Sequence, residues 1–261
     1  MPANYTHYRF GAAQFAAMSA DVRRPIQRHR RLFDVGLHGP DIFFYYNPIA
    51  STVVGDLGSV YHGQTGQKFF TRAGRMLRLT PSEPALSYLY GLLCHYALDS
   101  VIHPYVRVQK EKVSAKHIEM EMEFDRWLLE RDGKTPPHAQ DLSAHLRLTA
   151  AEAAVAAKFF PPATGRQISA CIRNMTAGVK LMTASGGVSR KIVETGARLL
   201  GGRAANALMP TGPNPACAHL DEEFMALYRK AEARFPRLLE EMGAHLACGA
   251  PLGKLFAEPF D

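Results

Sequence analysis

Residues 91–106 read GLLCHYALDSVIHPYV, and this stretch decides the fold. Its mostly apolar composition is typical of a helix that is buried on all sides. The exceptions are His95, Asp99 and His103, which are spaced four residues apart. Each such step turns a helix by about 40° and climbs about 6 Å, so the three side chains share one face. His95 and His103 are then about 12 Å apart along the axis, too far to bind one ion together, whereas Asp99 lies next to both. The row predicts a core helix that could serve two metal ions.

The rest of the chain also has helical periodicity, and no segment reads as a strand. Ser82, followed by Glu83 and Pro84, is a start signal for the helix that carries His95. We predict an all-α fold, a single multi-helix domain over residues 1–261 with a metal cluster between core helices. Glycine and proline predict loops over 34–58 and 201–216. The predicted helices cover 10–22, 83–102, 116–132, 141–160, 164–182 and 219–242.

Composition supports one large domain, with 261 residues of which 47% are hydrophobic and 21% charged. No apolar run approaches the roughly 20 residues of a membrane span, so no transmembrane segment is expected. The opening residues have neither a basic nor an apolar signal region, which predicts a cytoplasmic location. The cysteines show no CxxC spacing, which argues against a cysteine zinc site and a disulfide framework. We expect reduced core thiols at Cys94, Cys171, Cys217 and Cys248.

The net charge of +7 favours anionic partners, and a peripheral contact with an anionic membrane is one of them. The densest basic stretch runs from Arg23 to Arg31, and a solvated surface turn or helix is its favoured interpretation. Aromatic residues do not interleave with these cations, so a platform for single-stranded nucleic acid has little support. Nucleic acid is therefore considered only as a substrate.

A second pair of candidate ligands, His117 and Glu121, lies four residues apart on the next predicted helix. Such a pair can hold zinc, although on a solvated helix it is usually a simple surface pair. The short connection after His103 allows antiparallel packing, which would bring His103 and His117 together. A metal role is favoured for the first row as well, because an unpaired buried Asp99 would cost several kcal/mol and no lysine or arginine shares its face.

Three further residues precede these groups in the chain: His7 in YTHYRFG, Asp41 in GPDIFFY and His62 in VYHGQ. In this order, followed by HYALDSVIH and HIEME, the set resembles the zinc-dependent phospholipase C family. Relatives of that family include the catalytic domain of glycosylphosphatidylinositol-specific phospholipase D and the fungal single-strand-specific nucleases. The resemblance spans about the first half of the chain.

The resemblance implies two or three zinc ions per chain. The ligands of the first would be Asp41, His62, His95 and Asp99. Those of the second would be His103, His117 and Glu121. A third ion would be held by His7 with the other oxygen of Asp99, although six residues precede His7 here, where the secreted phospholipases use their terminal residue. Secretion is accordingly the alternative location.

Other residues keep two interpretations. The turn at Gly39 and Pro40 aims Asp41 inward, or else Asp41 only caps that turn. His38 is a spare ligand candidate close by. The aromatic run FFYYNP, residues 43–48, lines an acyl-chain or base pocket or, as the better interpretation, packs in the core. Surface or capping positions are expected for His29, His138, His145, His219 and His245.

The functional hypothesis is a metal-dependent phosphodiester hydrolase that attacks phosphate with a zinc-bound hydroxide. Asp41 is the candidate catalytic residue, orienting or deprotonating the attacking water. Phospholipid is the favoured substrate, and a nucleic acid or a small phosphodiester is the alternative. Two other classes stay open. One is a helical iron protein, whose usual Glu-x-x-His pairs are not found in the sequence. The other is a non-catalytic metal-binding or adaptor protein.

Overall fold

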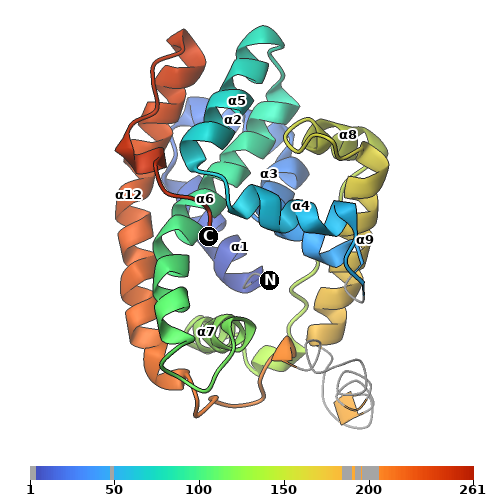
Figure 1. The fold of residues 1–261 in the computed structure, drawn as a ribbon, viewed down its shortest axis with the longest axis vertical. Helices are drawn as coiled ribbons and strands as arrows, with labels where there is room; N and C mark the ends of the chain where they lie inside the picture. Colours follow the sequence, from blue (N-terminus) through green and yellow to red (C-terminus); the bar gives the residue numbers. More distant parts are fainter. Residues whose placement is uncertain (1–3, 48–49, 184–189, 192–194, 196–205) are drawn as a thin grey trace.

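The long helix α6 (Glu83–Gln109) runs through the centre of the molecule (Figure 1). Ser82 caps its start by accepting a hydrogen bond from the Ala85 amide, as the start signal predicts. Burial is continuous from Ser87 to His103, which explains why the sequence is apolar on every side of this helix. The helix extends beyond the predicted end at residue 102.

The computed structural model describes residues 4–47, 50–183, 190–191, 195 and 206–261. Within these ranges the fold is all-helical, as predicted, and no strand is present. One connected apolar core includes residues from Tyr5 to Phe260. The other α-helices are α1 (Asn4–Ala17), α2 (Ala20–Arg28), α3 (Arg30–Gly36), α4 (Val53–His62), α5 (Gly66–Leu79), α7 (His117–Arg131), α8 (Ala150–Ala157), α9 (Gly165–Met182) and α12 (Asp221–Cys248). The 3₁₀ helices are η1 (Gly39–Tyr45), η2 (Pro137–Ala139), η3 (Ala218–Leu220) and η4 (Lys254–Phe256).

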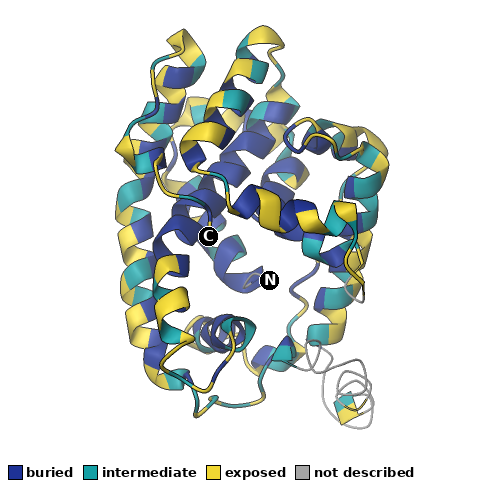
Figure 2. Ribbon diagram, viewed as in Figure 1, coloured by how far each residue is buried: buried dark blue, intermediate teal, exposed yellow. Residues whose placement is uncertain are grey.

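Helices α1, α2, α3 and α12 pack directly against α6. In Figure 1, α12 forms one flank of the molecule and α9 the opposite flank, with α6 between them. Figure 2 shows α6 buried over its middle and exposed near its ends, whereas α12 alternates between buried and exposed residues along its length, as an outer helix must. The surrounding helices therefore keep water from most of the α6 side chains.

A pair of glycines sets the closest contact between two helices. A methyl group on Gly91 of α6 would lie 2.3 Å from the carbonyl oxygen of Phe33 and 2.8 Å from the Cα of Gly36. Helix α3 can therefore cross α6 almost backbone to backbone only because neither residue has a side chain. This crossing places the end of α3, at Leu37, next to His95, one turn further along α6.

Several predicted boundaries are wrong for identifiable reasons. The predicted helix over 10–22 is two helices, because the chain bends at Met18 and Ser19 between α1 and α2. Residues 141–149 are not helical, and α8 starts only after a capping box formed by Thr149 and Glu152. The predicted loop over 34–58 contains η1 and the start of α4. Helix α5 was not predicted at all. Part of the loop predicted over 201–216, residues 201–205, lies outside the described residues.

The four cysteines form no disulfide bond with one another, but the prediction that all of them lie in the core is wrong. Cys94, Cys171 and Cys217 are buried, whereas Cys248, in the last turn of α12, is exposed. Among the described helices, none combines the length and the apolarity that crossing a bilayer requires.

The glycine contact gives a direct test of the fold. Gly91→Ala should lower the free energy of unfolding by about 1–3 kcal/mol, because the added methyl group meets backbone that cannot move aside. Gly243→Ala is the matched control, since that glycine of α12 is exposed and has nothing within 4 Å of the added carbon. It should stabilise the protein by about 0.5–1 kcal/mol. Urea unfolding of both variants measures the difference, and equal effects would contradict the crossing.

Candidate metal centre

Asp99 lies at the middle of a group of buried histidines. Its Oδ2 atom is 2.9 Å from Nε2 of His95, one turn earlier on α6. Its Oδ1 atom is 3.8 Å from Nε2 of His103, one turn later, and 3.1 Å from Nε2 of His7. All four side chains are less than a tenth exposed. The sequence prediction that Asp99 faces both histidines of its own helix is confirmed.

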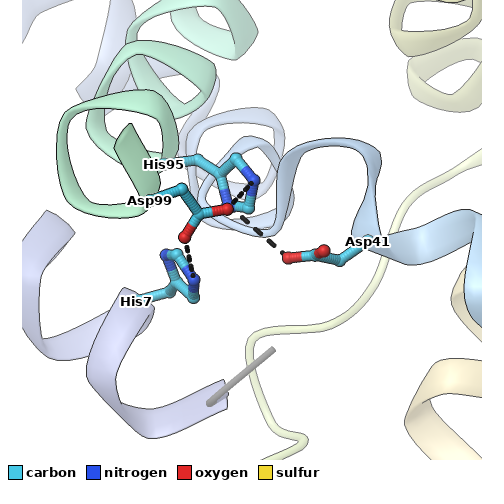
Figure 3. Close-up of side chains that lie close together, drawn as sticks. All are labelled: His7, Asp41, His95 and Asp99. Carbon is cyan, nitrogen blue, oxygen red and sulfur yellow. Dashed lines mark ion pairs between the residues drawn. The ribbon is translucent and has the colours of Figure 1, made fainter. Parts of the chain in front are cut away.

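His7 reaches Asp99 because a buried carboxylate anchors the start of α1. Asp125 of α7 accepts hydrogen bonds from the Tyr5 and Thr6 amides at 2.9 and 2.8 Å and from the Thr6 hydroxyl. A carboxylate is favourable at this position because the first amides of a helix have no partner within it. In Figure 3, the His7 ring lies below Asp99 and points towards it. Its ring also stacks on that of His95, with centroids 4.6 Å apart.

The turn before η1 aims Asp41 into the same group, so Asp41 is not merely a turn cap. Gly39 has a φ of +44°, a conformation that suits glycine, and a methyl group there would meet the His95 ring at 2.3 Å. Asp41 is buried with one carboxylate oxygen 2.9 Å from Nε2 of His62, the last residue of α4. Its other oxygen, Oδ2, lies 3.6 Å from Nδ1 of His95, as drawn in Figure 3.

His103, His117 and Glu121 form a second group. Nε2 of His117 is 2.8 Å from Oε1 of Glu121, and Nε2 of His103 is 3.5 Å from the same oxygen. The predicted approach of His103 to His117 is confirmed, but the predicted antiparallel packing is wrong. Helix α7 packs mainly on α1, and Figure 1 shows it nearly end-on where α6 is seen lengthwise.

Three of the histidines are held in the orientation that metal ligands need. Nδ1 of His62 donates a hydrogen bond to the Gly58 carbonyl at 2.7 Å, that of His95 to Leu37 at 3.2 Å and that of His103 to Phe260 at 3.0 Å. A carbonyl oxygen can only accept, so each Nδ1 carries its proton and each Nε2 faces the carboxylates. A backbone carbonyl on the second ring nitrogen is the usual support of a metal-binding histidine.

The carboxylates need a cation beside them. Burial by itself would raise the pKa of Asp99, but His103 and His95 hold it well below its ordinary value. Burial would likewise raise the pKa of Glu121, which His117 and His103 lower. Burial alone would lower the pKa of His62 and of His103, yet the facing carboxylates raise these values to about 10 and about 9. Either protons or a metal ion must therefore lie between the imidazole nitrogens and the carboxylate oxygens.

Unpartnered atoms and available space both fit a metal ion. Asp41 Oδ2, His95 Nε2, Asp99 Oδ2 and Glu121 Oε2 are buried without a well-formed hydrogen bond in the described part of the chain. The candidate ligand atoms of His7, Asp41, His95 and Asp99 all lie within 4.8 Å of one another, and so do those of the second group. A void of about 20 Å³ between the groups, lined by His7, Asp99, His103 and Glu121, has room for one ion or water.

An open pocket of about 410 Å³ leads to both groups. Asp41 and His62 line it on one side, and His103, His117 and Glu121 on the other. Phe44, from the predicted aromatic run, lines it as well and stacks on His62, whereas its neighbour Phe43 is buried in the core. Arg107 lies at the pocket and pairs with Asp261 at 2.9 Å.

The segment 258–261 supports the site and was missed by sequence reasoning. The Phe260 carbonyl holds His103, and the Asp261 amide donates to the carbonyl of His62. The Phe260 ring contacts His62 and His95. No motif marks this segment, because backbone atoms do much of the holding and any residue type can supply them.

Three histidines differ from their predicted roles. His38, the spare ligand candidate, is fully buried, and its Nε2 atom lies 2.7 Å from Nε2 of His145. The ring of Tyr8 stacks on the His145 ring. His145 is therefore not a simple surface residue, and burial lowers its pKa to about 4. His245 is also buried, and it donates to the Ala250 carbonyl just beyond the end of α12.

The fold and the site define an all-helical protein with two buried carboxylate and histidine groups fit for metal ions. A sequence model of the zinc dependent phospholipase C family matches residues 6–172, which include all eight candidate ligands. The chain belongs to this family. No curated protein and no solved structure matches it.

Loss of the segment 258–261 should weaken metal binding more than loss of its one aromatic ring. A chain ending at Ala257 loses the carbonyl that holds His103, and its zinc affinity should fall about 10–100-fold. Phe260→Ala keeps that carbonyl and should retain zinc, although the cavity destabilises the fold by about 3–5 kcal/mol. Competition with a zinc chelator measures both effects. Equal zinc affinity in the shortened chain and the intact protein would show that the carbonyl is not needed.

Proposed function

We propose that this protein is a zinc-dependent phosphodiester hydrolase that cleaves phospholipids in the manner of a phospholipase C. The observation that carries the proposal is the shared orientation of His62, His95 and His103. Each ring donates its Nδ1 proton to a backbone carbonyl and presents Nε2 to a buried carboxylate. Membership of the zinc dependent phospholipase C family supports zinc and phosphodiester chemistry.

The two groups would divide the ions as follows. Asp41, His62, His95 and Asp99 would hold one zinc, and His103, His117 and Glu121 a second. His7 would share a third with Asp99 beside the small void between the groups. Asp99 belongs to the first and the third of these sites, because its Oδ2 faces His95 and its Oδ1 faces His7. Its Oδ1 also lies 3.8 Å from Nε2 of His103, a residue of the second site. The matched segment does not include residues 173–261, which we assign to the same domain because the core is continuous.

In the proposed reaction, water adds to phosphorus and the bond from phosphorus to the glycerol oxygen breaks. Zinc, when bound, supplies a Lewis acid that lowers the pKa of a bound water and neutralises phosphate oxygens. Asp41 would orient that water and take its proton, since Asp41 lines the pocket and its Oδ2 has no hydrogen bond within the described part of the chain. The leaving glycerol oxygen regains a proton, which gives diacylglycerol and a phosphorylated headgroup.

The pocket suits a phosphate with an apolar neighbour. Its metal-facing side combines residues of both groups, so a single phosphate can lie between them. Phe44 offers an apolar wall, and Arg107, paired with Asp261, also lines the pocket. These features support a phospholipid over a purely polar substrate.

The number of zinc ions per chain in two variants distinguishes the two groups of candidate ligands. Glu121→Gln should lose the ion held with His103 and His117 and keep the ion of the other group, whereas Asp99→Asn should lower occupancy in both. Hydrolysis should fall roughly 100-fold or more in each variant, since even supporting residues of metal sites cost 10–100-fold. Glu119→Gln is the matched control on α7, because a glutamine oxygen can still accept the hydrogen bond that the Lys116 amide donates to Glu119. Metal analysis of the folded protein measures the number of zinc ions per chain.

Full zinc content in both variants, with circular dichroism unchanged, would rule out the assigned ligands. Iron in place of zinc would indicate the redox or storage class. The control should retain all of its zinc and activity.

Substrate class is tested with purified protein and three substrates: phosphatidylcholine vesicles, a chromogenic phosphodiester and single-stranded DNA. We expect release of diacylglycerol from the vesicles at a rate above that of the other two hydrolyses. Faster cleavage of DNA would instead indicate the nuclease alternative. Zinc-loaded protein inert on all three would indicate a non-catalytic metal-binding protein.

A further inference from the structure

A basic hollow lies beside α5, separate from the metal centre. It has a volume of about 760 Å³ and is bounded by α5 and by the chain around the end of α12. Four cations line it, Lys68, Arg72, Arg75 and Arg78, which follow one face of α5. No aspartate or glutamate is among the described residues that line it.

The charge of these cations is not neutralised. Arg72 donates to the carbonyl of Phe159 at 2.7 Å, and Arg78 to the carbonyl of His245 at 2.6 Å. Carbonyls are neutral acceptors, so both guanidinium groups are positioned while their charge remains. Lys68 and Arg75 are exposed and form no ion pair with any described residue.

The densest basic stretch of the sequence, Arg23 to Arg31, shows the opposite arrangement. Most of its cations form ion pairs on the surface, so this stretch is the solvated face that the sequence predicts. The pairs are Arg24 with Asp21, Arg28 with Glu83, Arg30 with Asp34 and Arg31 with Glu152. The unneutralised charge of the hollow is therefore not a general property of this basic protein.

The other lining groups also suit a phosphate. Thr65, Gln67 and Thr71 add hydroxyl and amide groups at the same surface. Arginine and lysine with hydroxyl groups are the usual ligands of phosphate oxygens.

We propose that this hollow binds a phosphate-bearing ligand and that its source is the headgroups of an anionic phospholipid surface. The location supports this source. Thr65 lines the hollow and Gly63 lines the metal pocket, two residues away and so within about 8 Å along the chain. Val60 and Leu79 are exposed apolar residues of α4 and α5, suited to the edge of a bilayer. Anchoring here would hold the metal pocket near its lipid, which adds to the proposed function but does not require zinc.

The test is vesicle binding by the zinc-loaded protein. The double variant Lys68→Gln/Arg75→Gln removes the two exposed cations, whose side chains form no hydrogen bond or ion pair with the described residues. Its affinity for phosphatidylglycerol vesicles should fall about thirty-fold, from about 1 kcal/mol for each cation near an anionic surface. Lys230→Gln/Arg173→Gln is the matched control, with the same loss of charge at exposed residues of α12 and α9. The control should bind within about twofold of the unchanged protein.

Equal weakening of the two double variants would overturn the proposal, because net charge alone would then explain the attraction. A second arm adds inorganic phosphate and follows the amide resonances of Thr65, Gln67 and Thr71. Shifts with phosphate but no vesicle binding would overturn the lipid assignment in favour of a soluble phosphate ester. Glu121→Gln should bind vesicles as well as the unchanged protein does. Zinc content therefore tests the ligand assignment and vesicle binding tests the hollow, and the failure of one can be told from the failure of the other.

Discussion

The buried charge of Asp99 is the constraint on which the rest of the structure depends. A carboxylate inside a helical core costs several kcal/mol unless cations surround it, and no lysine or arginine lies within reach on α6. Four histidines from three helices fill this role: His95 and His103 on α6 itself, His7 from α1 and His62 from α4. Each of these helices must be placed to within a fraction of an ångström. The side chains of the candidate metal centre and the helices of the fold must therefore pack correctly at the same time.

The packing around Asp99 depends mainly on backbone atoms and on glycines, which have no side chain. Gly39 and Gly91 make room for the His95 ring and for the crossing of α3, and the end of α3 then supplies the Leu37 carbonyl to that same ring. Asp125 fixes the first turn of α1 so that His7 faces inward. Such supports leave the ligand nitrogens no freedom to turn away. They also hold in place the buried acceptor atoms of Asp41, Asp99 and Glu121 that lack hydrogen bonds.

The sequence predicts the parts of this arrangement that depend on spacing. Residues four apart on a helix must share a face, so the row on α6 and the pair on α7 follow from the chain alone. Asp41 and His62 were found only by resemblance, because their approach depends on how η1 and α4 fold back on α6. The late start of α8 was marked in the sequence by the capping box of Thr149 and Glu152 and was missed. The break between α1 and α2 and the crossing of α7 depend on tertiary contacts, which outweigh local propensity. The supports from Phe260 and Leu37 are backbone carbonyls, which no side-chain pattern can reveal.

The chain after α12 links the two binding regions of the molecule. Pro251 and Leu252 line the basic hollow, and Asp261, ten residues after Pro251, lines the metal pocket. Between them the segment is fastened to α5 at two points: Gln67 donates to the Leu252 carbonyl, and the Gly66 amide donates to the Glu258 carbonyl. The Tyr96 hydroxyl of α6 also binds the segment, because it lies within hydrogen-bond distance of the carbonyls of both Leu255 and Glu258. With fixed points so close together, the segment cannot shift at the hollow without straining the bonds that orient His103. The distance from the cations of the hollow to the candidate metal ligands is thereby set by the fold rather than by a flexible linker.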